Sequence, residues 1–475
     1  MVDQQVAAEL AEIVSPDGVI SRAAELRVYE CDGFTLAKSV PDVVVLPRST
    51  AEVAAVVRLL HRRGLAFVPR GAGTGLSGGC LPVEAPVMIG TSRLNRIREI
   101  DLVNRRAVVE AGVVNVWVSK AVEERGLLYA PDPSSQPACT IGGNVAENSG
   151  GPHTLKYGVT TNHVMGVELV LPDGDVVDLG GAMEDVPGYD LTGLVVGSEG
   201  TFGIVTSAVL RLIRQPEGWK TLLAVFESVD DASNTVSAII AAGIVPAALE
   251  MMDQLIVQAV EAAYHFGFPL DASAVLIVEL DGPTAGLEEQ TRQVLEVCRA
   301  NHARTVRVAA DEAERAALWK SRKRAFGAVG RLAPSYCTQD GVVPRTKVPE
   351  IVRRISEIGQ RYRLRIANVF HAGDGNIHPI LLYDERDHDE VHRVLDAGRE
   401  ILEACVALGG SVTGEHGIGV EKIEQMPLIF SPQDLLVMQQ LRSVFDPQQR
   451  SNPGKIFPTP GKCIETTRPQ RPASL

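Results

Sequence analysis

A glycine-rich stretch, Val68-Pro69-Arg70-Gly71-Ala72-Gly73-Thr74-Gly75-Leu76-Ser77-Gly78-Gly79, follows an apolar run that begins at Leu65 and is typical of a buried strand. Its glycines leave successive backbone N–H groups uncovered by any Cβ, which suits a pyrophosphate. The stretch contains a formal G-x-G-x-x-G match from Gly73 to Gly78, but Cys80-Leu81-Pro82 follows where a Rossmann loop requires a helix. We therefore expect a phosphate-binding loop in a fold other than the Rossmann fold.

Two more glycine-rich segments lie further along the chain. The first is Thr140-Ile141-Gly142-Gly143-Asn144-Val145-Ala146-Glu147-Asn148-Ser149-Gly150-Gly151, preceded by Pro131-Asp132-Pro133-Ser134-Ser135. The second is Gly197-Ser198-Glu199-Gly200-Thr201-Phe202-Gly203-Ile204-Val205-Thr206. One glycine loop alone is a weak signal, so these segments decide to which cofactor the phosphate belongs.

Candidate metal chemistry lies in two motifs near the C-terminal end, His371-Ala372-Gly373-Asp374-Gly375-Asn376-Ile377-His378-Pro379 and Gly414-Glu415-His416-Gly417. His371, His378 and Glu415 form a common open ligand set for a catalytic divalent metal. Residues seven apart on one strand face opposite ways, so the turn at 373–376 has to bring the two histidines together. On a strand, Glu415 and His416 would diverge, one toward the metal and one toward the substrate. A single histidine beside a glycine turn is more often structural, but the two motifs together indicate a metal site.

In their order along the chain, the three glycine-rich segments resemble the vanillyl-alcohol-oxidase type of FAD-binding domain. The two C-terminal motifs, with Asn452-Pro453-Gly454-Lys455-Ile456-Phe457, are similar to the branch that contains the glycolate oxidase flavin subunit, D-lactate dehydrogenase and D-2-hydroxyglutarate dehydrogenase. The resemblance implies an α+β fold, with a two-part FAD-binding domain and an α+β substrate-capping domain built on an antiparallel sheet.

The resemblance also implies site residues. It assigns contacts with FAD to Pro69, Arg70, Gly71, Ala72, Gly73, Thr74, Gly75, Ser77, Gly78, Gly79, Pro131, Asp132, Ser135, Thr140, Gly142, Gly143, Asn144, Ala146, Asn148, Ser149, Gly150, Gly151, Glu199, Gly200, Gly203, Ile204, Val205 and Asn452. Covalent relatives carry a histidine in the first loop or a cysteine beside the second. The first loop has no histidine and Cys139 is displaced by one position, so we expect non-covalent FAD.

A cation is needed to bind a substrate carboxylate, preferably a forked guanidinium. Trp319-Lys320-Ser321-Arg322 resembles the family segment whose arginine has this role, which makes Arg322 the first candidate and Arg345 the second. The alternative for either residue is a solvated helix face.

These residues together predict FAD-dependent oxidation of a D-2-hydroxy acid, with glycolate and D-lactate favoured over D-2-hydroxyglutarate. Zinc or manganese on His371, His378 and Glu415 would lower the pKa of the substrate hydroxyl, His416 would take its proton, and hydride would pass to flavin N5. A metallohydrolase leaves the glycine loops unexplained. A non-catalytic flavin electron-carrier subunit leaves His416 without a role.

Composition narrows the choice of partners. The 475 residues carry a formal charge of −13, which argues against nucleic acid. The seven cysteines include no C-x-x-C pair, so an iron–sulfur cluster that accepts the electrons would belong to a separate chain. Another acceptor protein or a quinone is the alternative electron acceptor. The sequence contains no evident signal sequence or membrane span, so we expect a cytoplasmic chain. Peripheral binding at the inner face of the membrane is an alternative. The sequence does not decide whether the chain forms a homodimer.

Apolar patterns and the loss of glycine-rich loops place a domain boundary near residue 216, so we expect an FAD-binding domain over residues 1–216. The resemblance implies a cap domain with the metal site over 217–425 and a segment at 426–462 that packs back on the FAD domain. The composition of residues 463–475 predicts a disordered tail. The cap should contain strands at 222–226 and 274–278, with helices from about Asp230 to Ala242 and Gly286 to Asn301 covering one side of a sheet.

Overall fold

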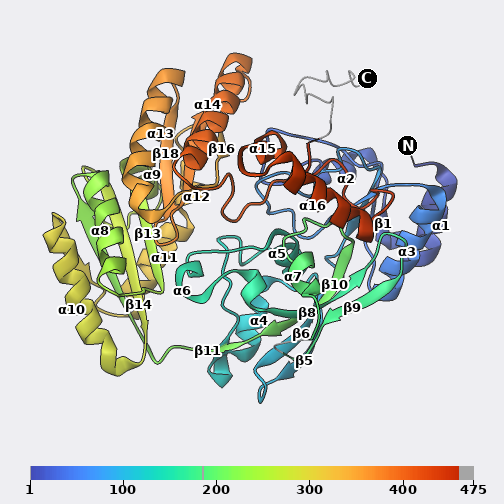
Figure 1. Cartoon of the computed structure of the whole chain (residues 1–475), viewed down its shortest axis with the longest axis horizontal. Coiled ribbons are helices and arrows are strands. Elements are labelled where there is room, and N and C mark those ends of the chain that lie inside the picture. Colours follow the sequence, from blue (N-terminus) through green and yellow to red (C-terminus); the bar gives the residue numbers. More distant parts are fainter. Residues whose placement is uncertain (1, 184–186, 459–475) are drawn as a thin grey trace.

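The computed structural model describes residues 2–183 and 187–458 and contains two sheet-based parts that lie side by side (Figure 1). The strands of the first part fall between residues 19 and 214, and those of the second between 218 and 383. This arrangement confirms the expected α+β class with a large antiparallel sheet. The expected tail at 463–475 lies outside the described residues.

The first part begins with a small sheet. Its strands, in spatial order, are β1 (Val19–Ile20), β2 (Val43–Val45), β4 (Val87–Gly90) and β3 (Phe67–Arg70). The pairs β2–β4 and β3–β4 are parallel. Helix α3 (Thr50–Arg63) begins where the Ser49 hydroxyl accepts the amide of Glu52, and it packs with α1 (Gln4–Val14) over this sheet. The first glycine loop leaves the end of β3.

A five-stranded antiparallel sheet completes the first part. Its order is β5 (Ile97–Asp101), β6 (Arg106–Glu110), β10 (Ile204–Arg211), β8 (Val164–Val170) and β9 (Val176–Gly180). Shorter elements accompany it: α2 (Ala23–Leu26), α4 (Asn115–Val122), α5 (Ile141–Glu147), α6 (Thr154–Tyr157), α7 (Leu191–Val195), and the pair β7 (Leu127–Leu128) with β11 (Ile213–Arg214). Helix α5 contains most of the second glycine segment and packs on β10.

The second part is built on one eight-stranded antiparallel sheet. Its order is β15 (Thr305–Val308), β12 (Gly218–Phe226), β14 (Ala274–Gly282), β13 (Ala248–Asp253), β18 (Arg365–His371), β19 (Asn376–Tyr383) and β16 (Ser335–Thr338), with β17 (Gly341–Val342) also paired to β19. The expectation of helices on one side of this sheet is wrong. One face carries α8 (Val229–Ala241), α10 (Thr284–Ala300), α13 (Val348–Tyr362) and α14 (His388–Ala407), and the other carries α9 (Gln254–Tyr264), α11 (Glu312–Lys323) and α12 (Ala325–Val329).

Burial explains why both faces are covered. Strand β14 is buried at eight consecutive positions, Ala274 to Asp281, and β19 is buried along its whole length. A continuous apolar run such as Ala274 to Val278 has no polar alternate positions to present to water, so each face of the sheet needs a covering layer.

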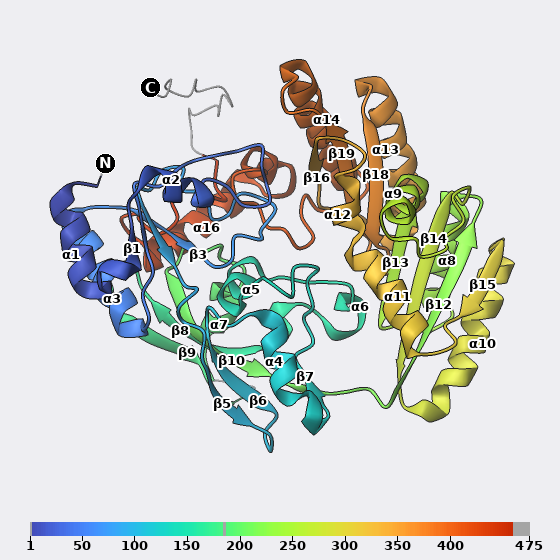
Figure 2. The same cartoon turned by 180° about the vertical axis from the view of Figure 1, so that it is seen from behind.

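The C-terminal segment returns to the first part, as Figure 2 shows from behind. It contains α15 (Met426–Ile429) and α16 (Pro432–Phe445). Phe445 stacks on Phe202 with ring centroids 4.4 Å apart, and Phe67 of β3 exchanges backbone hydrogen bonds with Arg450 and Asn452. These contacts place Asn452 beside the first glycine loop.

Candidate functional site

The two histidines of the first C-terminal motif lie on one hairpin. Strands β18 and β19 pair so that His371 is opposite Asn376 and Val369 is opposite His378. His371 and Val369 share a face because they are two residues apart, so both imidazoles point to the same side. Their ring centroids are 5.0 Å apart. The predicted turn at 373–376 therefore does bring them together.

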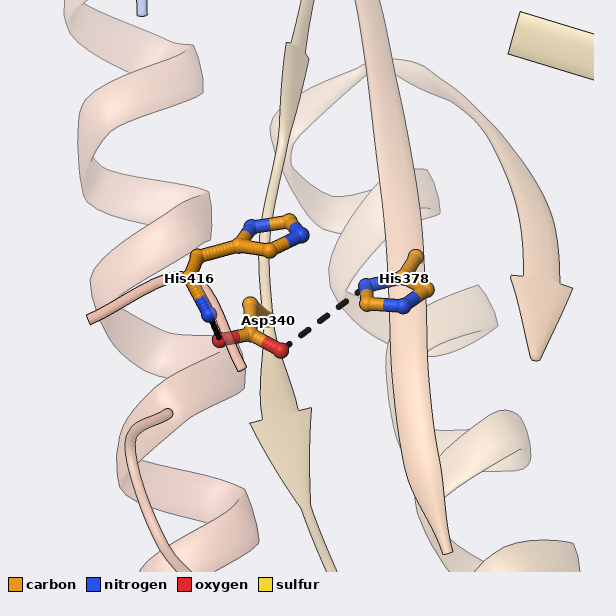
Figure 3. Close-up of side chains that lie close together, drawn as sticks. All are labelled: Asp340, His378 and His416. Atoms are coloured by element: carbon orange, nitrogen blue, oxygen red, sulfur yellow. Dashed lines mark hydrogen bonds and ion pairs between the residues drawn. The ribbon is translucent and has the colours of Figure 1, made fainter. Parts of the chain in front are cut away.

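Glu415 and His416 lie in a loop, and the expectation that they occupy a strand is wrong. The loop wraps around the carboxylate of Asp340, whose Oδ2 accepts the Thr413 hydroxyl at 2.6 Å and the backbone amides of residues 414, 415 and 416 at 2.9, 3.2 and 2.9 Å. Both side chains consequently reach the same cavity. The His416 ring stacks on that of His378, with centroids 4.9 Å apart and planes 5° from parallel (Figure 3).

The donor atoms of the predicted metal ligands converge. Glu415 Oε1 lies 3.1 Å from His371 Nε2 and 3.3 Å from His378 Nε2, and one donor from each residue falls within 4.8 Å of the others. Two imidazole nitrogens and one carboxylate oxygen fit a divalent metal that keeps positions open for a substrate. The residues present therefore match the donor set expected from the sequence.

A second carboxylate, that of Glu250, binds the nitrogen of His371 that faces away from Glu415. Glu250 on β13 accepts a hydrogen bond from His371 Nδ1 at 2.7 Å, and its other oxygen lies 2.5 Å from Arg322 Nε. A carboxylate on the far nitrogen fixes the orientation and tautomer of a metal-binding imidazole. Burial alone would lower the pKa of His371, but the charges of Glu250 and Glu415 outweigh it and raise that pKa to about 10. Burial lowers the pKa of His416 to about 4 despite the opposing charge of Asp340.

The glycine loops line the same cavity as the three predicted metal ligands. From the predicted cofactor set, the cavity wall includes Pro69, Arg70, Gly71, Ala72, Gly73, Thr74, Gly75, Gly79, Ser135, Thr140, Gly142, Gly143, Asn144, Ala146, Ser149, Glu199, Gly200, Gly203, Ile204, Val205 and Asn452. A Cβ on Gly71 would lie 2.5 Å from the Thr140 hydroxyl, so the first two loops approach closely at that glycine. Asn452 joins the first and third segments by donating to the carbonyls of Gly79 and Glu199.

Several polar groups in these loops are available to a phosphate-bearing cofactor. The amides of Ala72, Gly73 and Thr74 donate to no acceptor in residues 2–183 and 187–458. The hydroxyl of Thr140 is buried and likewise has no partner within those ranges. Unpaired buried polar groups are uncommon in folded proteins, and a bound phosphate would satisfy them.

The other predicted cofactor residues do not line this cavity. They are Ser77, Gly78, Pro131, Asp132, Asn148, Gly150 and Gly151. The Ser77 hydroxyl donates to the carbonyl of His416, and Asp132 pairs with His153 Nδ1 at 2.9 Å. These two residues hold neighbouring segments together.

The candidate arginines are not at the cavity surface. Arg322 is buried beneath it, and neither its Nη1 nor its Nη2 has a hydrogen-bond partner in the described part of the chain. Arg345 lines a separate pocket with Asp374 and donates to the carbonyl of Gly373. The cap residues that do line the main cavity, besides the metal ligands and His416, are Lys323, Phe326, Tyr336 and Thr338.

Sequence reasoning missed Asp340 and Glu250. Each is a carboxylate on or beside a strand, far along the chain from the residues that it orients. Glu250 lies in an otherwise apolar strand, Ala248 to Met252, where an isolated charge could have indicated a buried partner. Gln339-Asp340-Gly341 offers no such local signal because its partners are backbone amides.

Two family models match this chain. The model of an FAD binding domain matches residues 41–180, and the model of the C-terminal domain of FAD linked oxidases matches residues 215–456. The chain belongs to the family of FAD-linked oxidases. Membership confirms the resemblance seen in the glycine-rich segments and shows that the chain is an FAD-dependent oxidoreductase with an FAD binding domain.

Full-length relatives of this FAD-linked oxidase are similar over most of their length. The glycolate oxidase subunit GlcD of Escherichia coli (strain K12) is 46% identical over 441 residues, covering 93% of this chain and 88% of that protein. The GlcD subunit of Bacillus subtilis (strain 168) is 42% identical, covering 96% and 97%. A D-lactate dehydrogenase of Archaeoglobus fulgidus is 32% identical, covering 87% and 91%.

Solved structures share the fold of this oxidase. The 4-ethylphenol oxidase from Gulosibacter chungangensis superposes with a TM-score of 0.78 at 20% identity, covering 96% of this chain and 97% of that one. The p-cresol methylhydroxylase superposes with a TM-score of 0.75 at 17% identity, with the same coverage. They confirm the expected fold class.

If His371, His378 and Glu415 are the ligands, zinc or manganese should bind at one ion per FAD, and Glu415→Gln should weaken that binding by more than about tenfold, since losing even an outer-shell partner costs 10–100-fold. Metal titration with elemental analysis measures the effect. Glu421→Gln is the matched control because Glu421 is a nearby buried carboxylate that binds Gln339. Chelation should remove the metal and leave FAD bound. Full turnover by a metal-free preparation would contradict the assignment.

Proposed function

We propose that this oxidase converts a short D-2-hydroxy acid, glycolate or D-lactate, into the corresponding 2-oxo acid. The observation that carries the proposal is that the converging donors of His371, His378 and Glu415 open into the same cavity as the flavin-binding glycine loops. A substrate bound by these groups would lie beside the cofactor. The likeness to GlcD subunits and to a D-lactate dehydrogenase supports the same substrate class.

The residues of the cap would divide the work. When bound, FAD accepts the hydride from the α-carbon, and a divalent metal polarises the substrate hydroxyl. His371, His378 and Glu415 hold that metal, while Glu250 fixes the orientation of His371. His416 lines the cavity next to Glu415, where its imidazole can take the hydroxyl proton as general base.

The lining of the cavity favours a small substrate. The ring of Phe326 lies 6.3 Å from that of His378, so an aromatic wall stands beside the proposed metal site. The hydrogen of glycolate or the methyl group of D-lactate on the α-carbon suits this apolar wall, whereas the side chain of D-2-hydroxyglutarate would bring a second carboxylate that has to be desolvated against it. Lys323, the residue after Arg322, lines the cavity and is therefore the alternative cation for the substrate carboxylate.

The two GlcD relatives are each named as a subunit, and this chain has the same need for an electron acceptor. Neither group of metal-donor side chains found among the described residues contains a cysteine, and the six cysteines described there are free. We therefore keep a separate iron–sulfur subunit, another acceptor protein or a quinone as the proposed acceptors. None of the described helices has the length and apolar character needed to cross a bilayer.

The direct test is anaerobic reduction of the bound flavin. Glycolate or D-lactate should bleach its absorbance, and D-2-hydroxyglutarate and L-lactate should do so far more slowly. Faster bleaching by D-2-hydroxyglutarate would instead support the hydroxyglutarate dehydrogenase alternative. A flavin that none of these acids reduces would overturn the proposal in favour of an electron-carrier subunit.

His416→Asn should slow flavin reduction by about a hundredfold to ten-thousandfold, the usual loss when a general base is removed. Asn keeps a polar side chain of similar reach but cannot accept the proton. Metal content and FAD content should stay unchanged, because neither depends on this imidazole. A rate within about threefold of the unmodified enzyme, well below that range, would remove His416 from the role.

Arg322 does not line the cavity, but its Nη1 and Nη2 have no hydrogen-bond partner among the described residues. If these atoms bind the substrate carboxylate from beneath the cavity, Arg322→Lys should weaken 2-hydroxy-acid turnover, because losing a fork to a desolvated carboxylate costs about 2–5 kcal/mol. The loss should appear in the concentration dependence of flavin reduction with metal content unchanged. A loss of metal would show instead that Arg322 acts through Glu250. Arg345→Lys is the control. If flavin reduction is impaired in Arg345→Lys and normal in Arg322→Lys, Arg345 binds the substrate carboxylate.

If flavin reduction is impaired only in Lys323→Met, Lys323 binds the substrate carboxylate.

A further inference from the structure

Glu147, the last residue of helix α5, lines the main cavity together with the glycine-rich loops. Its Oε2 is buried and has no hydrogen-bond partner in residues 2–183 or 187–458. Buried polar atoms are normally paired, so this oxygen lacks an expected partner. Because the side chain lines the cavity, a molecule bound there can supply that partner.

The carboxyl group of Glu147 reaches from the glycine loops to the loop of the proposed base. A Cβ on Gly79, at the end of the first glycine loop, would lie 2.6 Å from Oε1 of Glu147. A Cβ on Gly417 would lie 2.6 Å from Oε2. Since Gly417 directly follows His416, the carboxyl group is close to the place where substrate and cofactor would meet.

A second carboxylate shares these surroundings. Oε1 of Glu199 lies 2.9 Å from the same Cβ position of Gly417, and Glu199 accepts the amides of Ile418 and Gly419 at 2.7 and 2.8 Å. Amide donors stabilise the ionised form of a carboxyl group, so the negative charge belongs on Glu199. Like charges this close oppose each other's ionisation, which leaves Glu147 as the group that holds a proton.

Two buried lysines lie near Glu147, but each contacts other groups. Lys455 Nζ donates to a backbone carbonyl at 2.7 Å and to Asn452 Oδ1 at 3.2 Å. The Lys422 ammonium lies 3.5 Å from Asp340. Burial, followed by the charge of the neighbouring carboxylates, raises the pKa of Glu147 well above its usual range, and the two lysines offset only part of this.

We propose that Glu147 is a cofactor-binding residue, and that it donates the hydrogen of a neutral carboxylic acid to an acceptor atom of the flavin ring of FAD. The ring is the part of FAD that accepts hydride, so it has to lie beside the substrate and His416, where the carboxyl group of Glu147 is found. The inference goes beyond the proposed substrate, but it rests on the proposed placement of FAD in this cavity.

The reduction potential of the bound flavin tests this contact. Reduction adds electron density to the ring, so a hydrogen bond to a ring acceptor stabilises the reduced form more than the oxidised form. Glu147→Leu removes the donor and should shift the equilibrium toward oxidised flavin by more than about tenfold, which is about 30 mV for two electrons. Glu147→Gln keeps an uncharged donor in nearly the same place, and a redox titration should find it within about threefold of the unmodified protein.

The direction of any shift in Glu147→Gln distinguishes the two protonation states. An ionised Glu147 would repel the reduced ring, so Glu147→Gln would then favour reduced flavin by more than about tenfold, and the proposal would be overturned. Infrared spectra of the FAD-loaded protein give a second readout. They should contain the C=O band of a protonated carboxyl group that is lost in Glu147→Gln and kept in Glu421→Gln. A spectrum that is unchanged in Glu147→Gln would also overturn the proposal.

The affinity for FAD separates the role of Glu147 from the placement of the cofactor. Thr140→Val removes a buried, unpartnered hydroxyl from the same cavity wall. Both Thr140→Val and Glu147→Leu should weaken FAD binding by roughly fivefold to a hundredfold, the cost of an unmade hydrogen bond. If neither variant loses affinity, FAD lies elsewhere, and both the placement and the proposal are wrong. If only Thr140→Val loses affinity, FAD lies in the cavity but Glu147 does not bind it.

Discussion

The site depends on a loop held by two carboxylates from different parts of the molecule. Asp340, beside the large sheet, accepts the amides of residues 414–416, and Glu199, from the third glycine segment, accepts the amides of Ile418 and Gly419 at 2.7 and 2.8 Å. Hydrogen bonds from amides to buried carboxylates are charge-assisted and directional. The loop therefore cannot move relative to either part without leaving a buried charge unpaired. This constraint sets the distance between the glycine-rich loops and the proposed metal ligands.

The same logic explains the charges beneath the ligands. Glu250 contacts both His371 and Arg322, and the side chains of Glu250 and Arg322 are almost fully buried. Such a pair adds little to stability compared with apolar residues, but removing one partner costs about 3–5 kcal/mol because the other charge remains buried. Its benefit is orientation: the imidazole that it holds has one preferred tautomer and ring position. The buried ion pair thus fixes the orientation of His371, although apolar residues in its place would contribute at least as much to stability.

Much of this arrangement could be predicted from the sequence, and the limits have physical causes. The glycine loops and the turn between the two histidines are local features, so residue types and spacing were sufficient to predict them. The layer on the second face of the large sheet and the loop geometry at Glu415 depend on distant partners. Asp340 could not be found because it is recognised by backbone amides, which every residue carries. The place of Arg322 could not be predicted for the same reason: it lies beneath the cavity wall and pairs with Glu250, which is far from it in the sequence.

The two parts of the molecule contribute to the cavity by different means. The flavin loops present mainly backbone groups of glycine and neighbouring residues, so their binding surface depends on chain conformation. The cap presents side chains, from Lys323, Phe326, Tyr336 and Thr338 together with the histidines. A side chain can change while the sheet that supports it keeps its hydrogen bonds, whereas a Cβ added at Gly71 would collide with the Thr140 hydroxyl. Substrate preference can therefore vary through the side chains of the cap wall, whereas a side chain added at Gly71 would have to displace the Thr140 hydroxyl between the first two glycine-rich loops.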